Sequence, residues 1–443
     1  MANNVVTDNS KLVLNAFAAI FQNNLACADL VTWKQYNDEM EDRNRLTFSE
    51  QIGPRFAVTQ TSNGVTDLSG GVQDVVFGSE QFQINQVFGA SMGWGDFVKI
   101  RDVSEARESM ALKNAAMNLA EKIDAYVLRT AVLASNNWTG TPGNNVSAFD
   151  AVASGYTRLK DEGVDDADLR AILTYNDMQA LGSSIVTNNA SLTNLGDNTF
   201  RDGFTGIVAG IPTNFTQQLP VMSTGSRTNG TVNGAAQNSN YSAVSVSSYP
   251  GAYLTQTISI SGLGAAGTVF DGEVFTLGLV NAWDNRLGAA IPRLQQFRVI
   301  APSGTQPGAL AYTADASGNI AALRIFPALI VAGSGTGGDI NVNTANATVS
   351  QAPATGAAVT WITTALNSVK ARAIIQKQSI IVNTADLIIP ATGQAMRKTL
   401  TKVPVSVRMW RDSLFNTGDH RIRFDIALTA NVRDRRRVVR ING

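Results

Sequence analysis

The sequence predicts an α+β chain that carries an inserted all-β, barrel-like domain. Three observations support this prediction: one long apolar stripe at helical spacing, a region before it that is rich in turn residues and β-formers, and a later region of low charge. In that later region, residues 221–370, only eleven of 150 side chains are charged. At 443 residues, the chain is long enough for two or three domains, each with its own core.

The first predicted element is a helix over residues 12–28, within an N-terminal arm and helix assigned to residues 1–42. Its apolar residues recur at three- and four-residue spacing, as on one helical face: Leu14, Phe17, Phe21 and Leu25. The N-terminus has no basic region followed by an apolar core, and no apolar run approaches the ~18 residues of a membrane span. We therefore expect a soluble, unexported protein with no membrane partner.

Residues 43–100 are predicted to form an extended β-hairpin loop with no helix. Short Gly-containing turns separate four stretches with the composition of paired strands: RLTFSEQ, PRFAV, QDVVFG and QFQINQV. A long hairpin without a local core cannot bury its apolar face alone. We expect it to become stable by lying on a neighbouring subunit.

The clearest helix is predicted over residues 102–133, at the start of a segment assigned to residues 101–148. Asp102 and Glu105 fit a capping box. An apolar stripe from Leu112 to Val127 holds one face. At ~1.5 Å per residue, about thirty residues form a rod of about 45 Å, which is long for a globular helix.

A compact α/β region is predicted over residues 149–220, with helices near 149–162 and 175–181 and a strand at 168–173. Mixed α/β character returns at residues 346–400, so the region between them is interpreted as an insertion.

The inserted β domain is assigned to residues 221–345. It is rich in Ser, Thr, Gly, Asn and Val, and residues 228–270 carry no charge at all. Alternating strands at roughly ten-residue spacing, separated by Gly or Asn turns, indicate a small barrel or sandwich.

The last segment, residues 401–443, is predicted to consist of C-terminal strands. Residues 397–443 hold twelve Lys or Arg against four Asp, a local charge of +8 in a chain of zero net charge. Such an asymmetry indicates an interaction end or charge pairing between subunits.

The chain's one histidine, His420, lies in this basic segment, at the start of a predicted strand that pairs with residues 405–410. We expect four nearby arginines to contact carboxylates within or between subunits: Arg408, Arg411, Arg421 and Arg423. Arg55 is a further candidate for a subunit contact. Four arginines near the C-terminus are either DNA-facing or paired with carboxylates: Arg433, Arg435, Arg436 and Arg437.

No motif makes a persuasive active site, so we expect no enzymatic activity, cofactor or metal. GLGAAG at residues 262–267 matches a dinucleotide-binding pattern, but a predicted strand follows it where a helix is needed. Ser91 in GASMG, with His420, could supply two members of a hydrolase triad, but no helix follows directly to form a nucleophile elbow. A single cysteine, Cys27, excludes a disulfide framework and is interpreted as a buried helical residue.

The order of these elements resembles the major capsid (coat) protein of tailed double-stranded-DNA bacteriophages. The similarity is to the short-tailed-phage, or podovirus, type that carries an inserted domain. It spans almost the whole chain and rests on these stretches: PRFAV, DVSEARESMALKNAAMNLAEKIDAYVL, FRDGFTGIVAGIPTNFTQQLP, EVFTLGLVNAW, LQQFRVI and VPVSVRMWRDSLFNTGDHRIRFDIAL.

The resemblance implies the tailed-phage capsid fold, with a long spine helix and an extended loop, and an axial domain built on a sheet. It also implies pentamers and hexamers of an icosahedral shell, a scaffolding protein during assembly, a portal protein at one vertex and packaged dsDNA inside. The protein would be a virion capsid component assembled in the host bacterial cytoplasm. In the family the insert often bears a long charged loop, whereas residues 228–270 here are uncharged, so apolar or strand-pairing contacts are expected.

Three alternatives remain open. A cellular nanocompartment shell of the same fold would enclose an enzyme instead of a genome. From other classes, a serine hydrolase would use Ser91 and His420, and a surface adhesin would bind glycans through the low-charge β domain.

Overall fold

A computed structural model describes residues 2–40, 46–58, 73–94, 110–189, 206–246, 252–302, 307–390, 394–413 and 420–443. The chain forms two compact units, each with helices and sheet, in agreement with the predicted α+β class. The first unit comprises Met1–Thr47, Gln83–Ala131 and Lys377–Arg433. The second comprises Phe48–Phe82, Val132–Gln376 and Asp434–Gly443.

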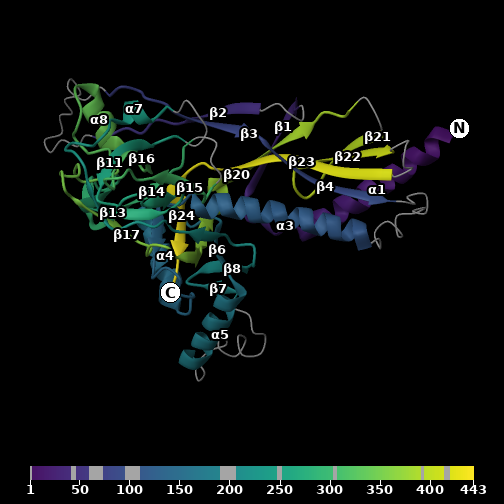
Figure 1. The fold of residues 1–443 in the computed structure, drawn as a ribbon, viewed down its shortest axis with the longest axis horizontal. Helices are drawn as coiled ribbons and strands as arrows, with labels where there is room; N and C mark the ends of the chain where they lie inside the picture. Colours follow the sequence, from purple (N-terminus) through teal and green to yellow (C-terminus); the bar gives the residue numbers. More distant parts are fainter. Residues whose placement is uncertain are drawn as a thin grey trace. The chain divides into compact units, whose positions relative to one another are not determined.

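A six-stranded sheet centred on β23, His420–Val432, forms the framework of the first unit (Figure 1). β23 pairs antiparallel with β4, β20 and β22, while β1 lies parallel to β20 and β21 pairs with β22. The bounds are β1 Thr32–Met40, β4 Gln86–Trp94, β20 Ile380–Leu387, β21 Gln394–Thr399 and β22 Ser406–Ser413. His420 stands opposite Ser413, which confirms the predicted hairpin.

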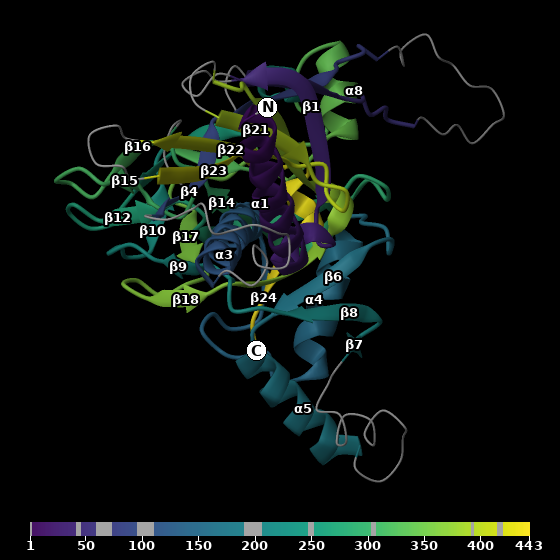
Figure 2. The same cartoon turned by 90° about the vertical axis from the view of Figure 1, so that its right-hand side faces the viewer.

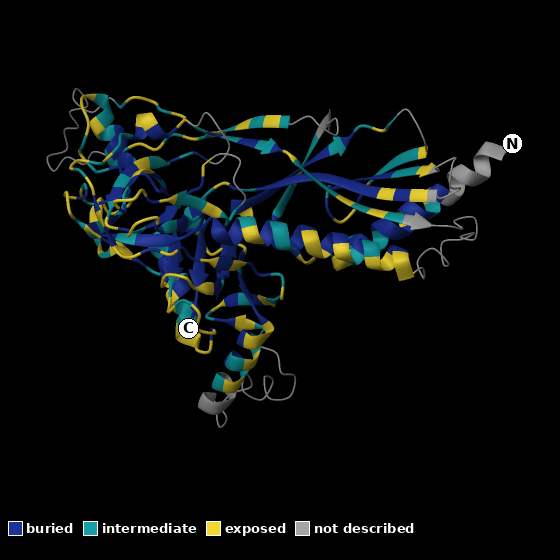
Figure 3. Cartoon of the chain, in the orientation of Figure 1, coloured by how far each residue is buried: buried dark blue, intermediate teal, exposed yellow. Residues whose placement is uncertain are grey.

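Two helices in this part of the chain follow the predicted apolar stripes. α1 spans Ala2–Asn24 and buries Phe17 and Phe21. Phe17 stacks on Phe424 of β23 with ring centroids 3.8 Å apart and the planes at 4°. α3 spans Met110–Leu133 and alternates buried and exposed faces (Figure 3). Its predicted start at Asp102 and Glu105 lies outside the described residues.

A buried carboxylate in α3 fixes the short 3-10 helix η1, Ala26–Ala28. The Asp124 carboxylate accepts hydrogen bonds from the backbone N–H groups of Ala26 and Cys27 at 2.8 and 2.9 Å. Burial raises the pKa of the Cys27 thiol, and the charge of Asp124 raises it further. Cys27 is therefore a buried, neutral thiol, as the sequence predicts.

The second unit contains another six-stranded sheet, in the order β5-β24-β19-β6-β8-β7. α4 packs on β24, β19 and β5, and Figure 2 shows α4 close to β24 and β6. The bounds are β5 Asn137–Thr139, α4 Phe149–Asp161, β6 Leu169–Leu173, α5 Tyr175–Asn189, β7 Ile207–Val208, β8 Ile211–Phe215, β19 Arg372–Gln376 and β24 Val438–Ile441. The strand and both helices predicted between residues 149 and 181 are present.

The predicted insert is a closed six-stranded barrel, in the order β10-β11-β16-β14-β13-β17. Aromatic and branched aliphatic side chains fill it, among them Phe275, Phe297 and Leu323. The bounds are β10 Gly230–Val232, β11 Gln256–Ser261, β13 Val274–Asp284, β14 Ala289–Val299, β16 Ile320–Phe326 and β17 Ala358–Trp361. The barrel therefore continues beyond the predicted boundary at residue 345. The helix α8, Gly338–Ala345, interrupts the β pattern of the sequence before the last strand, so the prediction ended the domain too early.

The two chain passages that enter and leave the barrel pair with each other. β9, Val221–Ser223, and β18, Ser368–Lys370, form an antiparallel two-stranded sheet. Smaller elements accompany the barrel: α7 Tyr241–Val244, β12 Thr268–Phe270 and β15 Leu310–Thr313.

Two predicted segment assignments differ from the structure. Residues 43–100 are not one hairpin: β2, Leu46–Ile52, pairs with β3, Gly78–Ile84, but β4 joins the first unit's sheet. PRFAV and most of QDVVFG are not strands, and the predicted turns between them lie outside the described residues.

The predicted division at residue 400 also fails, because β20 and β21 share a sheet with β22, and β24 lies in the other unit. Alternation of apolar and polar residues identifies strands, but it does not show which strands pair.

No helix in the described ranges has both the length and the apolarity to cross a membrane.

We predict that Phe424→Ala lowers the free energy of unfolding by about 3–5 kcal/mol, because it removes a fully buried ring stacked on Phe17. Urea unfolding of the unassembled protein measures this. Phe149→Ala is the control, since Phe149 is 57% exposed. Equal stability of the two variants would contradict the importance of the Phe17–Phe424 contact.

Candidate functional site

The hydrolase motif is part of a strand, which contradicts a catalytic role for Ser91. Ser91 lies within β4, opposite Arg423 of β23. A nucleophile elbow needs a tight turn between a strand and a helix, whereas β4 is continuous through GASMG. Gly89 in this motif has a packing role, because an added Cβ would lie 2.7 Å from the Asp425 carboxylate.

The glycine-rich GLGAAG stretch is a turn between β11 and β12. Gly262 and Gly264 have φ of 77° and 87°, values that favour glycine. Strand β12 begins at Thr268, so the next element is the predicted strand, and a dinucleotide-binding helix N-terminus does not follow.

A buried ion-pair cluster joins β22 and β23. The fully buried Asp425 carboxylate accepts from Arg408 Nη2 at 2.7 Å and from Arg423 Nε at 2.5 Å. Arg408 also donates to the carbonyl oxygen of Ile388 at 2.9 Å, and its side chain is 2% exposed. Arg408 thus makes its expected carboxylate contact within its own unit, where it stabilises the sheet.

The other arginines of this hairpin differ in exposure. Arg423 pairs with Asp425 but leaves 45% of its side chain exposed, and Arg421 is exposed. Burial lowers the pKa of Arg411. Because Arg421 and Arg423 are exposed, they remain available for contacts with another molecule. The structure describes no side chain for His420.

Near the C-terminus, Arg435 is buried and pairs with a carboxylate of β3. Its Nη2 donates to Glu80 Oε1 at 3.3 Å, and its guanidinium lies 4.9 Å from the ring centroid of Phe326. Burial raises the pKa of Glu80 to about 7, and the charge of Arg435 offsets only part of this. The charge-pairing alternative is thus observed for Arg435, and burial argues against a DNA-facing role.

Arg436 and Arg437 share the carboxylate of Asp434 in the 3-10 helix η4, Arg435–Arg437. The closest ion-pair distances are 3.1 Å for Arg436 and 3.3 Å for Arg437. Burial raises the pKa of Asp434, but the two arginines outweigh it and hold the pKa well below its usual value. Arg433 is exposed.

Arg440 is a structural centre that the sequence pattern does not reveal. Its guanidinium is fully buried and donates to four backbone carbonyl oxygens at 2.7–3.0 Å: those of Val132, Leu133, Ser135 and Gly272. Burial lowers its pKa to about 9, and the charge of Arg298 lowers it further. Carbonyl groups at the end of α3, which have no partner within the helix, are satisfied in this way.

A second buried pair lies at the entry to the barrel. Arg227 Nε is 2.7 Å from Glu273 Oε2, with side chains 1% and 0% exposed. The guanidinium lies 4.0 Å from the ring centroid of Trp361 in the last barrel strand. Burial raises the pKa of Glu273 to about 7 although Arg227 opposes the shift. Arg227 thus joins the barrel's entry to its exit.

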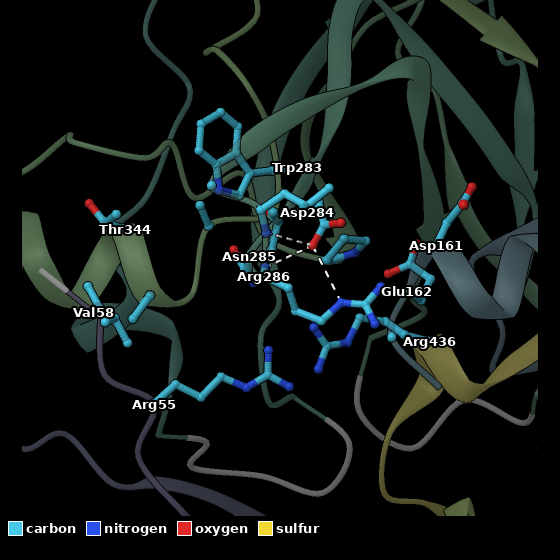
Figure 4. Close-up of a pocket in the computed structure, with 18 of the residues that line it drawn as sticks. Arg55, Val58, Asp161, Glu162, Trp283, Asp284, Asn285, Arg286, Thr344 and Arg436 are labelled. Carbon is cyan, nitrogen blue, oxygen red and sulfur yellow. Dashed lines mark hydrogen bonds and ion pairs between the residues drawn. The ribbon is translucent and has the colours of Figure 1, made fainter. Parts of the chain in front are cut away.

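One cavity of about 730 Å³ opens between several elements of the second unit (Figure 4). Its walls come from residues 55–58, the end of α4, the β13–β14 turn and Arg436. Arg55, Arg286 and Arg436 extend into the same region of it, and three carboxylates also line it: Asp161, Glu162 and Asp284.

Comparison with known proteins identifies the chain's family. The family model described as "P22 coat protein - gene protein 5" matches residues 1–435. The chain belongs to this family. No curated protein sequence shows a significant match.

Several solved structures are distantly similar to this coat protein. A structure titled Mycobacterium phage Che8 is 10% identical, with 90% of this chain and 84% of that chain covered and a TM-score of 0.40. The mature capsid of bacteriophage PhiM1 is also 10% identical, with coverages of 93% and 85% and a TM-score of 0.40. The capsid of cyanophage P-SCSP1u is 9% identical, with coverages of 93% and 86% and a TM-score of 0.40.

The P22 coat protein family match confirms the predicted resemblance to tailed-phage major capsid proteins. The protein is a structural, non-enzymatic coat protein of a phage virion, and it assembles with copies of itself into an icosahedral shell. The family supports a phage coat over the nanocompartment alternative.

We predict that Arg440→Met lowers the free energy of unfolding of the coat protein by roughly 3–5 kcal/mol, because four buried carbonyl oxygens lose their donor. Arg421→Met is the matched control and should change stability by less than about 0.5 kcal/mol, since Arg421 is exposed. Urea unfolding measures both. A stable Arg440→Met variant would show that the carbonyl groups find other partners.

The buried carboxylates predict a pH dependence of stability. The pKa values of Glu80 and Glu273 rise from 4.5 to about 7 on folding, so the folded state holds protons that the unfolded state releases. Their contribution is present below pH 4.5 and is lost as the pH rises to about 7, by roughly 3 kcal/mol each. Stability measured from pH 4.5 to 7.5 should fall less in Glu80→Gln/Glu273→Gln than in the wild type. Parallel curves would refute the shifted pKa values.

Proposed function

We propose that this coat protein holds its shell together through the segment between β2 and β3, which lies on a neighbouring subunit in pentamers and hexamers. One observation carries the proposal. Large apolar side chains at the two described ends of the segment, residues 53–58 and 73–77, are exposed: Phe56 54%, Val58 94%, Val75 58% and Phe77 53%. Burying one such side chain contributes about 1.5–3 kcal/mol, so a neighbour that covers several would gain a stable contact.

The two units take different roles in this proposal. The first unit, with most of α3 and the sheet around β23, serves as the peripheral domain, and the sheet around β19 and β24 serves as the axial domain. The barrel is a lateral contact domain. Residues 228–270 carry no charge, and Leu279 and Leu287 are 78% and 80% exposed, which supports apolar contacts over salt bridges.

The remaining surface charges suit weaker, non-specific contacts. Arg421 and Arg423 are proposed to contact carboxylates of another subunit, and Arg433 to face either such carboxylates or packaged dsDNA on the inner surface. A scaffolding protein during assembly, a portal protein at one vertex and assembly in the host cytoplasm complete the proposal. Many weak contacts per subunit make a shell stable through multivalency.

Phe56→Ser/Phe77→Ser should abolish or strongly reduce shell formation while the unassembled chain keeps its thermal stability, because both rings are exposed in the single chain. Electron microscopy and sedimentation of the assembled fraction measure this. Phe149→Ser, on α4, is the control with similar exposure and should assemble normally. Normal shells from the double variant would contradict the proposed role of the segment.

A further inference from the structure

The cavity of the second unit contains a cation that its own chain leaves unpaired. Arg55 is exposed and forms no ion pair within the described part of the chain. Its strongest electrostatic neighbour is another cation: the charge of Arg436 lowers the pKa of Arg55, and the charge of Asp434 offsets only part of this. Two neighbouring guanidinium groups of like charge destabilise each other unless an anion lies between them.

The carboxylates in the cavity wall are already occupied by other arginines. Asp284 pairs with Arg286 at 3.6 Å. Asp161 and Glu162 each lie 3.2 Å from Arg293. Asp434 is likewise shared by Arg436 and Arg437. Among the described arginines that line the cavity, Arg55 is therefore the one without an ion pair.

We infer that the cavity binds an acidic peptide segment from a second copy of this coat protein, with one carboxylate seated between Arg55 and Arg436. This inference rests on the proposed function, because it needs neighbouring copies in a shell. Guanidinium groups bind carboxylates with two parallel hydrogen bonds, which adds geometric specificity to the charge attraction.

The chemistry of the walls favours a peptide over a nucleic acid. Asp161, Glu162 and Asp284 would repel a chain of phosphates, but they leave room for a single carboxylate beside Arg55. Phe56, Val58 and Leu287 add exposed apolar surface for neighbouring side chains of a peptide. A volume of about 730 Å³ accommodates several side chains.

The second copy is the favoured source because it carries the complementary charge. The chain has zero net charge but +8 in residues 397–443, so the rest of each copy carries −8. Neighbouring copies in a shell bring this net negative charge to one another at high local concentration.

A photo-crosslinking amino acid at position 287 tests the inference, because Leu287 lines the cavity and is 80% exposed. In assembled shells we expect a covalent dimer whose crosslinked peptide, identified by mass spectrometry, comes from a second copy and contains Asp or Glu. The same probe at position 366 is the control, since Leu366 is 79% exposed and does not line the cavity. Val58 is a second probe site if the first variant does not assemble.

Arg55→Ala should reduce the dimer yield and raise the protein concentration needed for assembly about tenfold, equal to 1.4 kcal/mol. Its melting temperature should not change, because Arg55 has no ion pair in its own unit. A second variant combines Arg55→Glu with an Arg substitution at the acidic residue that the crosslink identifies. Because this exchange reverses both charges, it should restore assembly.

Three results would overturn the inference: crosslinks only within one chain, crosslinks to nucleic acid or to a different protein, or a dimer yield unaffected by Arg55→Ala. If the wild-type protein forms no shells under any condition, the proposed function fails instead. Electron microscopy of the wild type separates these two cases.

Discussion

The buried guanidinium of Arg440 is the constraint on which the second unit depends. It binds carbonyl oxygens from the end of α3, from the segment that follows and from Gly272, just before the barrel strand β13. These segments are far apart in the sequence and meet at one cation on β24. A buried guanidinium that has no contact with water must be fully hydrogen-bonded. The segments that supply its carbonyl oxygens are therefore fixed relative to one another. The last strand of the chain thereby holds the end of the helix close to the turn that precedes β13.

The same principle recurs wherever distant segments meet. Arg227 and Glu273 join the entry of the barrel to the start of β13, Arg435 and Glu80 join η4 to β3, and Arg408 and Asp425 join two strands. Each pair is nearly inaccessible to solvent, so its net effect on stability is small compared with the cost of removing one partner. A misfolded arrangement that separates the two partners leaves a buried charge unpaired. Such pairs therefore destabilise misfolded arrangements more than they stabilise the native one.

The sequence predicted the elements better than their partners. Apolar periodicity correctly indicated α3, the hairpin at His420 and the barrel-like insert, because each depends on local spacing. It did not show that β17 closes the barrel or that β24 leaves the other C-terminal strands, since pairing is decided by tertiary contacts. The candidate site was predicted least well: Arg408 and Arg440 were indistinguishable from surface arginines, because charged residues are seldom fully buried. Arg55 was selected, but its cavity could not be predicted from the sequence.

The stack of Phe17 on Phe424 has a consequence for biosynthesis. The two rings are about four hundred residues apart in the chain, and β23 supplies the central strand of the first unit's sheet. At roughly 5–20 residues per second, the ribosome needs about 20–80 seconds to make the intervening chain. During that time the apolar face of α1 has no partner from β23. Until β23 has been made, the apolar face of α1 must be kept from incorrect contacts. Slow formation of such contacts, a low concentration of the protein or a chaperone would prevent them.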